Sequence, residues 1–274
     1  AKCNQRKGKN MLRGHQLEMQ QIATRIATGS SVKTIIASVT PGGGKSSLPI
    51  ILAKELIPSY ADAICWVAPR TNLQVQGEKA FKAEWLRGLL HHSHEIRKST
   101  NDVNPSRNLA GHITTYQAIG TSWSNLAQDF ARKRYILFLD EPHHIADNGS
   151  WANALQPLID NAKLVVFASG TFERHDKKPI AFLPYLRLDE GLIIDLSPSP
   201  AKHVLTYNRT AALREKAIVP LSFEIFDGRT EYIDANGDLQ IDESIEKTTN
   251  NAASLHTALN TDFAYNMLQQ CVSE

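Results

Sequence analysis

The sequence predicts an α/β fold, a three-layer sandwich in which helices cover both faces of a mostly parallel central sheet. Short apolar runs rich in β-branched residues alternate with stretches of helical spacing from residue 14 to residue 171. Such alternation is typical of parallel strands joined by right-handed helical crossovers. A glycine run follows one apolar segment and two carboxylates follow another, at strand ends where parallel sheets bind ligands.

In the first third of the chain, a glycine and a proline mark where expected helices end or begin. Gly29 is a stop signal for the first helix. Pro49 falls near the first turn of the second helix, where proline is tolerated. The expected elements are, in order, helix 14–30, strand 33–39, helix 45–59, strand 62–69 and helix 72–90.

The middle of the chain continues the alternation after a long polar segment. Residues 91–108 are polar and without period, so we expect a loop there. The elements expected after it are strand 111–116, helix 124–134, strand 135–141, helix 151–162 and strand 163–171.

The pattern changes after about residue 195. Residues 219–241 look like strands separated by turns at Asp227-Gly228 and Asn236-Gly237, and residues 252–272 have helical spacing. We therefore expect a basic N-terminal tail at 1–10, a main domain at 11–198, and a small C-terminal β/α connector at 199–274.

Composition sets few limits on function. The 274 residues are 42% hydrophobic, which is ordinary for a globular protein with a sizeable core. A net charge of +2 neither requires nor excludes a nucleic-acid partner. The three cysteines are widely separated, which favours a reduced, cytoplasmic setting. No apolar run approaches the roughly 18 residues of a membrane span, so we expect no membrane partner.

The glycine run predicts a phosphate site. Gly42, Gly43 and Gly44 lie between a buried strand and a helix start, and Lys45 and Ser46 follow them. Glycines allow backbone N–H groups to approach a phosphate, and a helix N-terminus favours the anion. The usual pattern begins with a further glycine, where this chain has Val39. The alternative is a strand-to-helix turn with a surface lysine.

Asp140 and Glu141 close the strand at 135–141. One carboxylate can hold hydrated Mg²⁺ while its neighbour activates a water. The alternative is a helix N-cap beside an exposed acid. His143 and His144 follow, but without a third ligand nearby a zinc site is not expected.

Six segments together resemble the ordered motifs of superfamily II helicases of the DEAD/DEAH-box type. The resemblance covers about residues 11–195, and it is nearest to the helicase-like subunits of restriction systems and to helicases of mobile elements. The segments are "LRGHQ", "TPGGGKS", "VAPRTNLQVQ", "ITTYQAI", "DEPHH" and "FASGTFERHD". The resemblance implies a RecA-like P-loop NTPase domain, the first motor domain of such a machine.

The resemblance also implies roles for single residues. Lys45, Asp140 and Glu141 would be catalytic, with Ser46 and Asp140 on Mg²⁺, and Gln16 would read the adenine edge of ATP. The nucleotide-binding set is Arg13, Gln16, Pro41, Gly42, Gly43, Gly44, Lys45, Ser46 and Ser47. Nucleic acid would lie on Arg70, Thr114, Thr115 and Tyr116. Coupling between the two sites would use Ser169, Gly170 and Thr171.

The function expected from this resemblance is ATP hydrolysis coupled to movement on nucleic acid, with DNA favoured over RNA. A nucleotide-gated nucleic-acid binding module without motor activity is the alternative, and a P-loop kinase is a third. No segment after residue 200 has the form of the arginine-finger motif that the second motor domain carries in such helicases. We therefore expect this chain alone to be a weak ATPase, completed by a second motor domain in a longer chain and possibly serving restriction or mobile-element machinery.

Overall fold

The computed structural model describes residues 11–99, 102–188, 191–197, 199–220, 227–234, 236–244 and 251–273. The expected basic tail at 1–10 lies outside these residues. The chain divides into two compact units, Ala1–Val219 and Pro220–Glu274.

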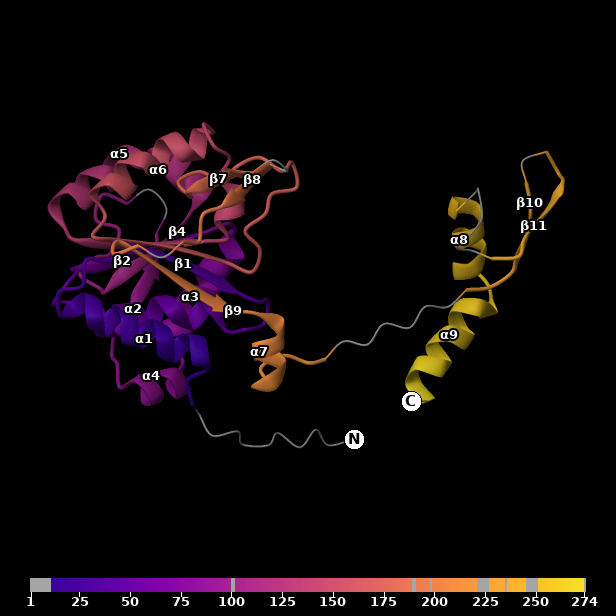
Figure 1. The fold of residues 1–274 in the computed structure, drawn as a ribbon, viewed down its shortest axis with the longest axis horizontal. Helices are drawn as coiled ribbons and strands as arrows, with labels where there is room; N and C mark the ends of the chain where they lie inside the picture. Colours follow the sequence, from indigo (N-terminus) through magenta and orange to yellow (C-terminus); the bar gives the residue numbers. More distant parts are fainter. Residues whose placement is uncertain are drawn as a thin grey trace. The chain divides into compact units, whose positions relative to one another are not determined.

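A seven-stranded sheet forms the centre of the first unit, in the order β3-β4-β2-β5-β6-β1-β9 (Figure 1). Every neighbouring pair of these strands runs parallel. The predicted parallel α/β sheet is therefore confirmed. The strands are β1 (Thr34–Val39), β2 (Ala63–Ala68), β3 (Ile96–Lys98), β4 (Gly111–Thr115), β5 (Tyr135–Asp140), β6 (Leu164–Ser169) and β9 (Lys202–Tyr207).

Helices cover both faces of this sheet. Helices α1, α2 and α3 lie on one face, and α5 and α6 lie on the other (Figure 1). The helices of the unit are α1 (Gly14–Ala27), α2 (Leu48–Leu56), α3 (Thr71–Lys82), α4 (Glu84–Leu90), α5 (Tyr116–Arg132), α6 (Ser150–Asn161) and α7 (Arg209–Arg214). Two short 3-10 helices, η1 (Lys45–Ser47) and η2 (Pro142–His144), follow β1 and β5.

The central strands β2, β5 and β6 are buried along their whole length. Their side chains alternate between two apolar cores, one under α1–α4 and the other under α5 and α6. In β5, Phe138 belongs to the first core, and Leu137 and Leu139 to the second. Strands that are covered on both faces consist of continuous apolar runs, and these runs predict the strands from the sequence.

Three elements differ from expectation in this part of the unit. The expected loop at 91–108 contains β3, which pairs with β4 through Ile96 and Gly111. The expected helix at 72–90 is two helices, because Ala83 has the extended torsion ψ 116°. The expected helix at 124–134 begins at Tyr116, where the Thr115 hydroxyl caps it by accepting from Ala118 N at 3.1 Å.

The first unit continues beyond the boundary expected at residue 198. Strand β9 pairs with β1 from Thr34–Lys202 to Val39–Tyr207, and α7 follows it. Because β9 completes the edge of the central sheet, the structure moves the end of this unit to Val219. A short antiparallel hairpin of β7 (Tyr185–Leu188) and β8 (Gly191–Ile194) precedes β9.

The second unit contains a hairpin and two helices. Strands β10 (Thr230–Ile233) and β11 (Leu239–Asp242) are antiparallel, and the expected turn at Asn236-Gly237 joins them, with Gly237 at φ 88°. The expected helix 252–272 is divided into α8 (Asn251–Leu259) and α9 (Asp262–Ser273). Residues 221–226, part of the expected strand region, lie outside the described residues.

Candidate functional site

The loop between β1 and η1 depends on glycine at each of three positions. Gly42 and Gly44 have φ 75° and φ 93°, in the left-handed region that favours glycine. A Cβ on Gly43 would lie 2.7 Å from the backbone oxygen of Thr40. The first and third glycines therefore permit the backbone path, and the second permits its close packing.

Residues at the start of α1 hold this loop. Arg13 Nη1 donates to the Gly42 oxygen at 3.1 Å and also contacts the Gly43 oxygen. Gln16 Nε2 donates to Ser47 Oγ at 2.7 Å, and Gln16 Oε1 accepts from the Arg13 backbone N–H at 2.9 Å. The Gln16 amide, expected to read adenine, thus forms its hydrogen bonds within the protein in this structure.

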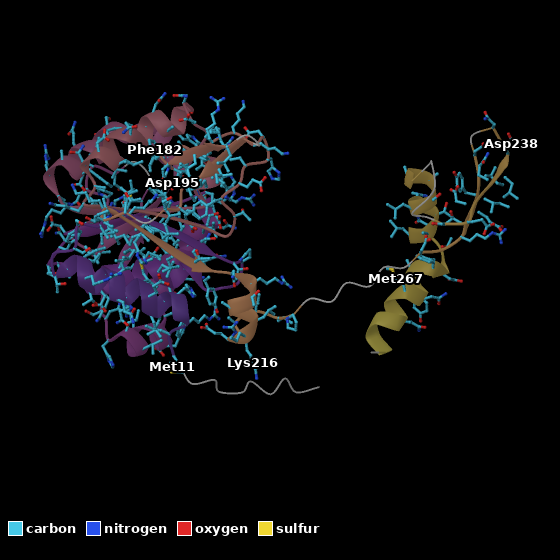
Figure 2. All side chains as sticks on the ribbon, in the orientation of Figure 1. Met11, Phe182, Asp195, Lys216, Asp238 and Met267 are labelled. Carbon is cyan, nitrogen blue, oxygen red and sulfur yellow. The ribbon has the colours of Figure 1, made fainter. Side chains whose placement is uncertain are left out.

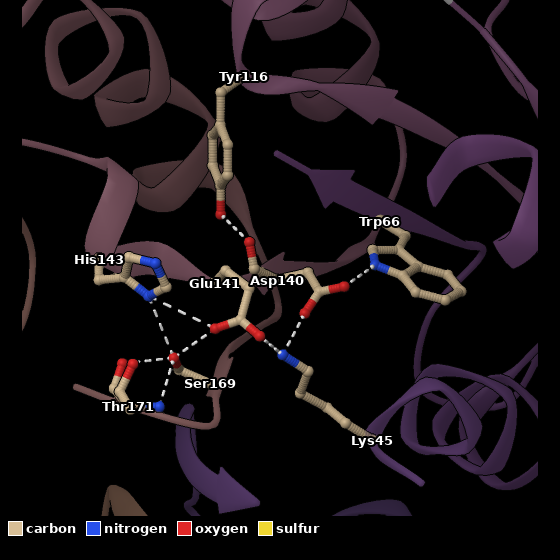
Figure 3. Close-up of polar contacts among 8 residues, drawn as sticks. All are labelled: Lys45, Trp66, Tyr116, Asp140, Glu141, His143, Ser169 and Thr171. Atoms are coloured by element: carbon tan, nitrogen blue, oxygen red, sulfur yellow. Dashed lines mark hydrogen bonds and ion pairs between the residues drawn. The ribbon is translucent and has the colours of Figure 1, made fainter. Parts of the chain in front are cut away.

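Lys45 and two carboxylates form the charged centre of the site (Figure 3). Lys45 Nζ lies 2.9 Å from Asp140 Oδ1 and also contacts Glu141 Oε1. Glu141 has φ 52°, and its backbone N–H donates to the Ala168 oxygen at 2.8 Å. The sheet therefore brings together the three expected catalytic groups, although Lys45 and Asp140 are 95 positions apart in the sequence.

The end of β6 contributes a hydroxyl to Glu141 (Figure 3). Ser169 Oγ lies 2.5 Å from both Glu141 Oε2 and the Thr171 backbone oxygen, so its single proton can serve only one of them at a time. Thr171 N–H donates to Ser169 Oγ at 3.1 Å. Ser169 is fully buried, and this fixes the position of its hydroxyl against Glu141.

His143 belongs to the same network, a position that the sequence did not predict. Its Nδ1 lies 3.3 Å from Ser169 Oγ and 3.4 Å from Glu141 Oε2. Arg174 holds the turn from the other side, since its Nη1 donates to the His143 backbone oxygen at 2.9 Å. The position of His143, two residues after Glu141, is the sequence feature that could have predicted this contact.

The surroundings shift the pKa values of the two carboxyl groups in opposite directions. Burial raises the pKa of Asp140, although the adjacent Lys45 ammonium opposes that change. Burial also acts to raise the pKa of Glu141, but the hydrogen bonds from Lys45 and Ser169 outweigh it and hold this pKa below its usual range. Glu141 is therefore charged at neutral pH and positioned to accept a proton.

The oxygen groups at the end of β5 and the start of η1 fit a magnesium ion. Asp140 is 7% exposed, and Trp66 Nε1 donates to its Oδ2 at 3.4 Å. A buried carboxylate whose charge is incompletely compensated, together with the Ser46 hydroxyl, offers hard oxygen ligands of the kind that Mg²⁺ prefers. Within the described residues no group of three or more His, Cys, Asp or Glu side chains could hold a metal.

The residues expected to contact nucleic acid do not share one surface. Arg70 is exposed at the N-cap of α3. Thr114 is 2% exposed, Thr115 uses its hydroxyl to cap α5, and Tyr116 is fully buried. The Tyr116 hydroxyl donates to the Asp140 backbone oxygen at 2.9 Å (Figure 3). The structure therefore corrects the expectation for these two side chains: Thr114 is buried by packing, and Tyr116 is buried and hydrogen-bonded in the interior.

Gly170 connects the end of β6 to the glycine loop. A Cβ on Gly170 would lie 3.1 Å from Pro41 Cδ, tighter than ordinary van der Waals contact. A glycine at this position lets the Ser169–Thr171 segment lie directly against the loop. Two of the expected sets, Pro41 on the nucleotide side and Gly170 on the coupling side, therefore contact each other.

A cavity of about 720 Å³ opens beside the loop. Its wall includes the loop residues Gly42, Gly44 and Ser46, residues 11–13 before α1, the junction of α3 and α4, and residues 215–217 after α7. Pockets of this size hold small organic ligands. The cavity and the charged centre lie on the same loop, so one elongated ligand could reach both.

Two curated relatives extend well beyond this chain. An uncharacterized protein of Mycobacterium tuberculosis is 27% identical over 212 residues, covering 77% of this chain and 33% of the relative. One of Mycobacterium leprae is 26% identical over 212 residues, covering 76% and 33%. The chain thus spans about a third of the length of these curated relatives.

Three solved structures to which this chain is similar are a helicase domain, a helicase and a restriction-modification enzyme. The Hef helicase domain of Pyrococcus furiosus has a TM-score of 0.44 at 16% identity, covering 58% of this chain and 32% of that one. The UvsW helicase of bacteriophage T4 has 0.41 at 18%, covering 56% and 52%. A nuclease-deletion mutant of the type ISP restriction-modification enzyme LlaGI, in complex with a DNA substrate mimic, has 0.46 at 12%, covering 76% and 21%.

Among the described residues, no helix has the length and apolar character needed to span a bilayer.

A family model matches the part of the chain that contains the loop, the charged centre and the end of β6. The matching model is that of the type III restriction enzyme, res subunit, and it covers residues 9–174. This is more than half of the chain and confirms the resemblance found in the motifs: the chain belongs to the type III restriction enzyme res subunit family, with a helicase-type first motor domain.

Proposed function

We propose that this chain is an ATP-binding motor domain of a DEAD/DEAH-like helicase or translocase, which hydrolyses ATP and couples the hydrolysis to movement on nucleic acid, DNA rather than RNA. The observation that carries the proposal is the contact of Lys45 with both Asp140 and Glu141 beside a glycine loop. Nucleotide hydrolysis needs a phosphate-binding group beside a water-activating group, and Lys45 and Glu141 would take these two roles.

The loop would bind the phosphates. Backbone N–H groups at Gly42 to Lys45 and the positive end of the following helix favour an anion. The Lys45 ammonium would exchange its contact with Glu141 for a phosphate oxygen. Mg²⁺, held by Ser46 and Asp140, would offset the negative charge of the phosphates when bound.

Glu141 would then accept the proton of the attacking water. Its carboxylate is charged at neutral pH, and the hydrogen bond from Ser169 orients it. Because Ser169 and His143 contact this carboxylate and the Thr171 N–H donates to Ser169, a shift at the end of β6 would change the position of the base. This is the coupling that we propose between hydrolysis and the nucleic-acid surface.

Arg70 would hold a strand of nucleic acid. It is exposed at the N-terminus of α3, where a cation and unpaired N–H groups suit a phosphate. We also propose that full activity needs a second motor domain in the longer protein, which would supply an arginine finger to the moving phosphoryl group.

Calorimetric titration with ATP and Mg²⁺ tests the nucleotide site. Lys45→Ala should weaken binding roughly 10- to 100-fold, because a charge-assisted contact to phosphate is lost. Lys82→Ala is the matched control, since Lys82 pairs with Glu78 on the surface of α3. Equal affinity in the parent and Lys45→Ala would refute the site. Tight binding without DNA-stimulated hydrolysis in the longer protein would favour the nucleotide-gated binding module.

A further inference from the structure

Trp66 brings a polar N–H group into an otherwise apolar strand. It lies in β2, where every residue is buried, and its own side chain belongs to the core under α1–α4. The side chains of the first unit fill the layer between these helices and the sheet (Figure 2). An indole N–H in such a layer needs an acceptor within the protein, because a buried donor without a hydrogen bond is unfavourable.

The acceptor is the carboxylate at the end of β5 (Figure 3). Trp66 Nε1 donates to Asp140 Oδ2 at 3.4 Å, while Lys45 Nζ lies 2.9 Å from Asp140 Oδ1. The terminal torsion of an aspartate is broad, so its carboxylate can rotate unless both oxygens are held. The indole therefore fixes Oδ2 in the core and leaves Oδ1 on the side of Lys45.

Two neighbours hold the indole itself. The Phe138 ring meets it edge-on, with 5.8 Å between the ring centroids and 74° between the ring planes. Helix α3 approaches it through Gly77, where an added Cβ would lie 2.8 Å from Trp66 Cζ3 and 2.6 Å from Ile113 Cδ1. Glycine is unfavourable inside a helix, and the space that the indole occupies explains it here. The indole is therefore held beside Asp140.

We propose that Trp66 is a positioning residue for the magnesium site: its N–H holds Asp140 Oδ2, and packing against Gly77 keeps the indole in place. The inference rests on the proposed function and extends it from the metal ligand to the residue that orients this ligand. Groups that hydrogen-bond to a metal ligand set its orientation, and their loss typically lowers metal affinity roughly 10- to 100-fold. Trp66 would therefore affect the metal-dependent part of nucleotide binding and not the metal-free part.

Calorimetric titration with AMP-PNP, once in Mg²⁺ and once in excess EDTA, separates these two parts. The ratio of the two affinities is the gain that the metal adds to nucleotide binding. Trp66→Phe keeps an aromatic ring but loses the N–H, and we expect it to lower this gain roughly tenfold. The affinity in EDTA should equal that of the parent, because the glycine loop and Lys45 are unchanged.

Gly77→Ala tests the same geometry without removing the N–H. The added methyl group would displace the indole, so the metal-dependent gain should fall in this variant too. Gly88→Ala is the matched control, since a Cβ at this position in α4 would meet no atom within 4 Å. An unchanged gain in Gly77→Ala would overturn the role of the α3 contact. If Trp66→Phe does not fold, the comparison of Gly77→Ala with Gly88→Ala decides the inference alone.

Manganese binding provides a second measurement that does not depend on hydrolysis. The EPR signal of free Mn²⁺, titrated against protein with saturating AMP-PNP, gives the affinity for the metal, and Trp66→Phe should lower it roughly tenfold. Ile26→Val controls for lost packing, because Ile26 is buried in the same core at the end of α1 away from the glycine loop. It should lower stability and leave the Mn²⁺ affinity unchanged.

The outcomes distinguish this inference from the proposed function. An equal metal-dependent gain in the parent and Trp66→Phe would overturn the inference, while loss of AMP-PNP binding in Lys45→Ala would still support the nucleotide site. Equal weakening by Trp66→Phe in Mg²⁺ and in EDTA would show a structural role of the indole and would also overturn the inference. A parent chain that binds AMP-PNP no better in Mg²⁺ than in EDTA would refute the magnesium site itself, and the inference with it.

Discussion

The ends of strands β4 and β5 lie at the same edge of the sheet but use their polar residues in opposite ways. After β5, Asp140 and Glu141 face Lys45, and Glu141 is partly exposed. After β4, Thr115 caps a helix and Tyr116 is fully buried. A polar residue at a strand end can act on a ligand only where the protein leaves its groups accessible.

The two strand ends are also physically connected. The Tyr116 hydroxyl donates to the backbone oxygen of Asp140 at 2.9 Å, so the end of β4 supports the end of β5. Tyr116 is therefore a positioning residue for the charged centre, and not part of a surface for nucleic acid. Substitutions at the two strand ends should have different consequences, for chemistry at one and for stability at the other.

Glu141→Gln should have the largest effect on chemistry. Loss of a general base typically lowers turnover roughly 10²- to 10⁴-fold. The amide keeps the shape of the side chain, so ATP affinity should change little. Single-turnover hydrolysis, with enzyme in excess, measures even a slow rate. Asp140→Asn is the companion variant and should weaken the Mg²⁺ dependence of binding; hydrolysis by Glu141→Gln at the parental rate would exclude Glu141 as the base.

Tyr116→Ala should instead act on stability. Removing a buried aromatic ring typically lowers the free energy of unfolding by about 3–5 kcal/mol. Tyr116→Phe removes only the hydroxyl and should cost about 1–3 kcal/mol, because the Asp140 oxygen loses a buried partner. Chemical denaturation measures both. If Tyr116→Phe were as stable as the parent but failed to bind nucleic acid, the assignment of Tyr116 to the interior would be contradicted.

The buried His112 in β4 should make stability depend on pH. Burial lowers its pKa to about 4, whereas an unfolded histidine titrates near 6.5. As the pH falls from about 6.5 to 4, the unfolded chain gains a proton that the folded chain refuses. Stability should therefore fall by roughly 3 kcal/mol across this interval. Burial also lowers the pKa of His15 and of His92 to about 4, so His112→Phe should remove only the share of this loss that His112 contributes, and the exposed His175→Phe should leave the loss unchanged.

Ser169→Ala tests the assignment of Glu141, at the end of β5, as the base. It removes a hydrogen bond that holds the pKa of Glu141 low, so this pKa should rise. Because a base works only when deprotonated, the acid limb of the rate profile for ATP hydrolysis should move to higher pH. Thr171→Ala, which keeps the backbone N–H bonded to Ser169, is the control. An unmoved acid limb would argue against Glu141 as the titrating base.

Arg70→Ala should have the smallest effect. Losing one phosphate contact should weaken nucleic-acid binding a few-fold and reduce the slope of log affinity against log salt by about 1. Lys163→Ala is the control, since this exposed lysine precedes β6 at the opposite edge of the sheet. Fluorescence anisotropy of a labelled single strand at several salt concentrations measures the slope. An equal change of the slope in both variants would mean that Arg70 does not contact the bound strand specifically.

The sequence by itself determined the parallel strands, the glycine loop and the carboxylate pair. Strands buried on both faces must be apolar throughout, so β1, β2, β5 and β6 could be located without a structure. The positive φ of Gly42 and Gly44 is a local property of the backbone that glycine makes possible. These features depend on neighbouring residues, and neighbouring residues are what a sequence pattern records.

The tertiary structure alone decided which of these residues remain available to a ligand. Strand β3 has only three residues, and β9 joins the sheet 163 residues after β1 ends, so their pairing depends on distant partners. The Gln16 amide bonds to Ser47, and Tyr116 supports Asp140, through contacts that chain folding creates. Burial and hydrogen-bond partners come from segments remote in the sequence, which is why a polar residue is a candidate base at the end of β5 and a structural support at the end of β4.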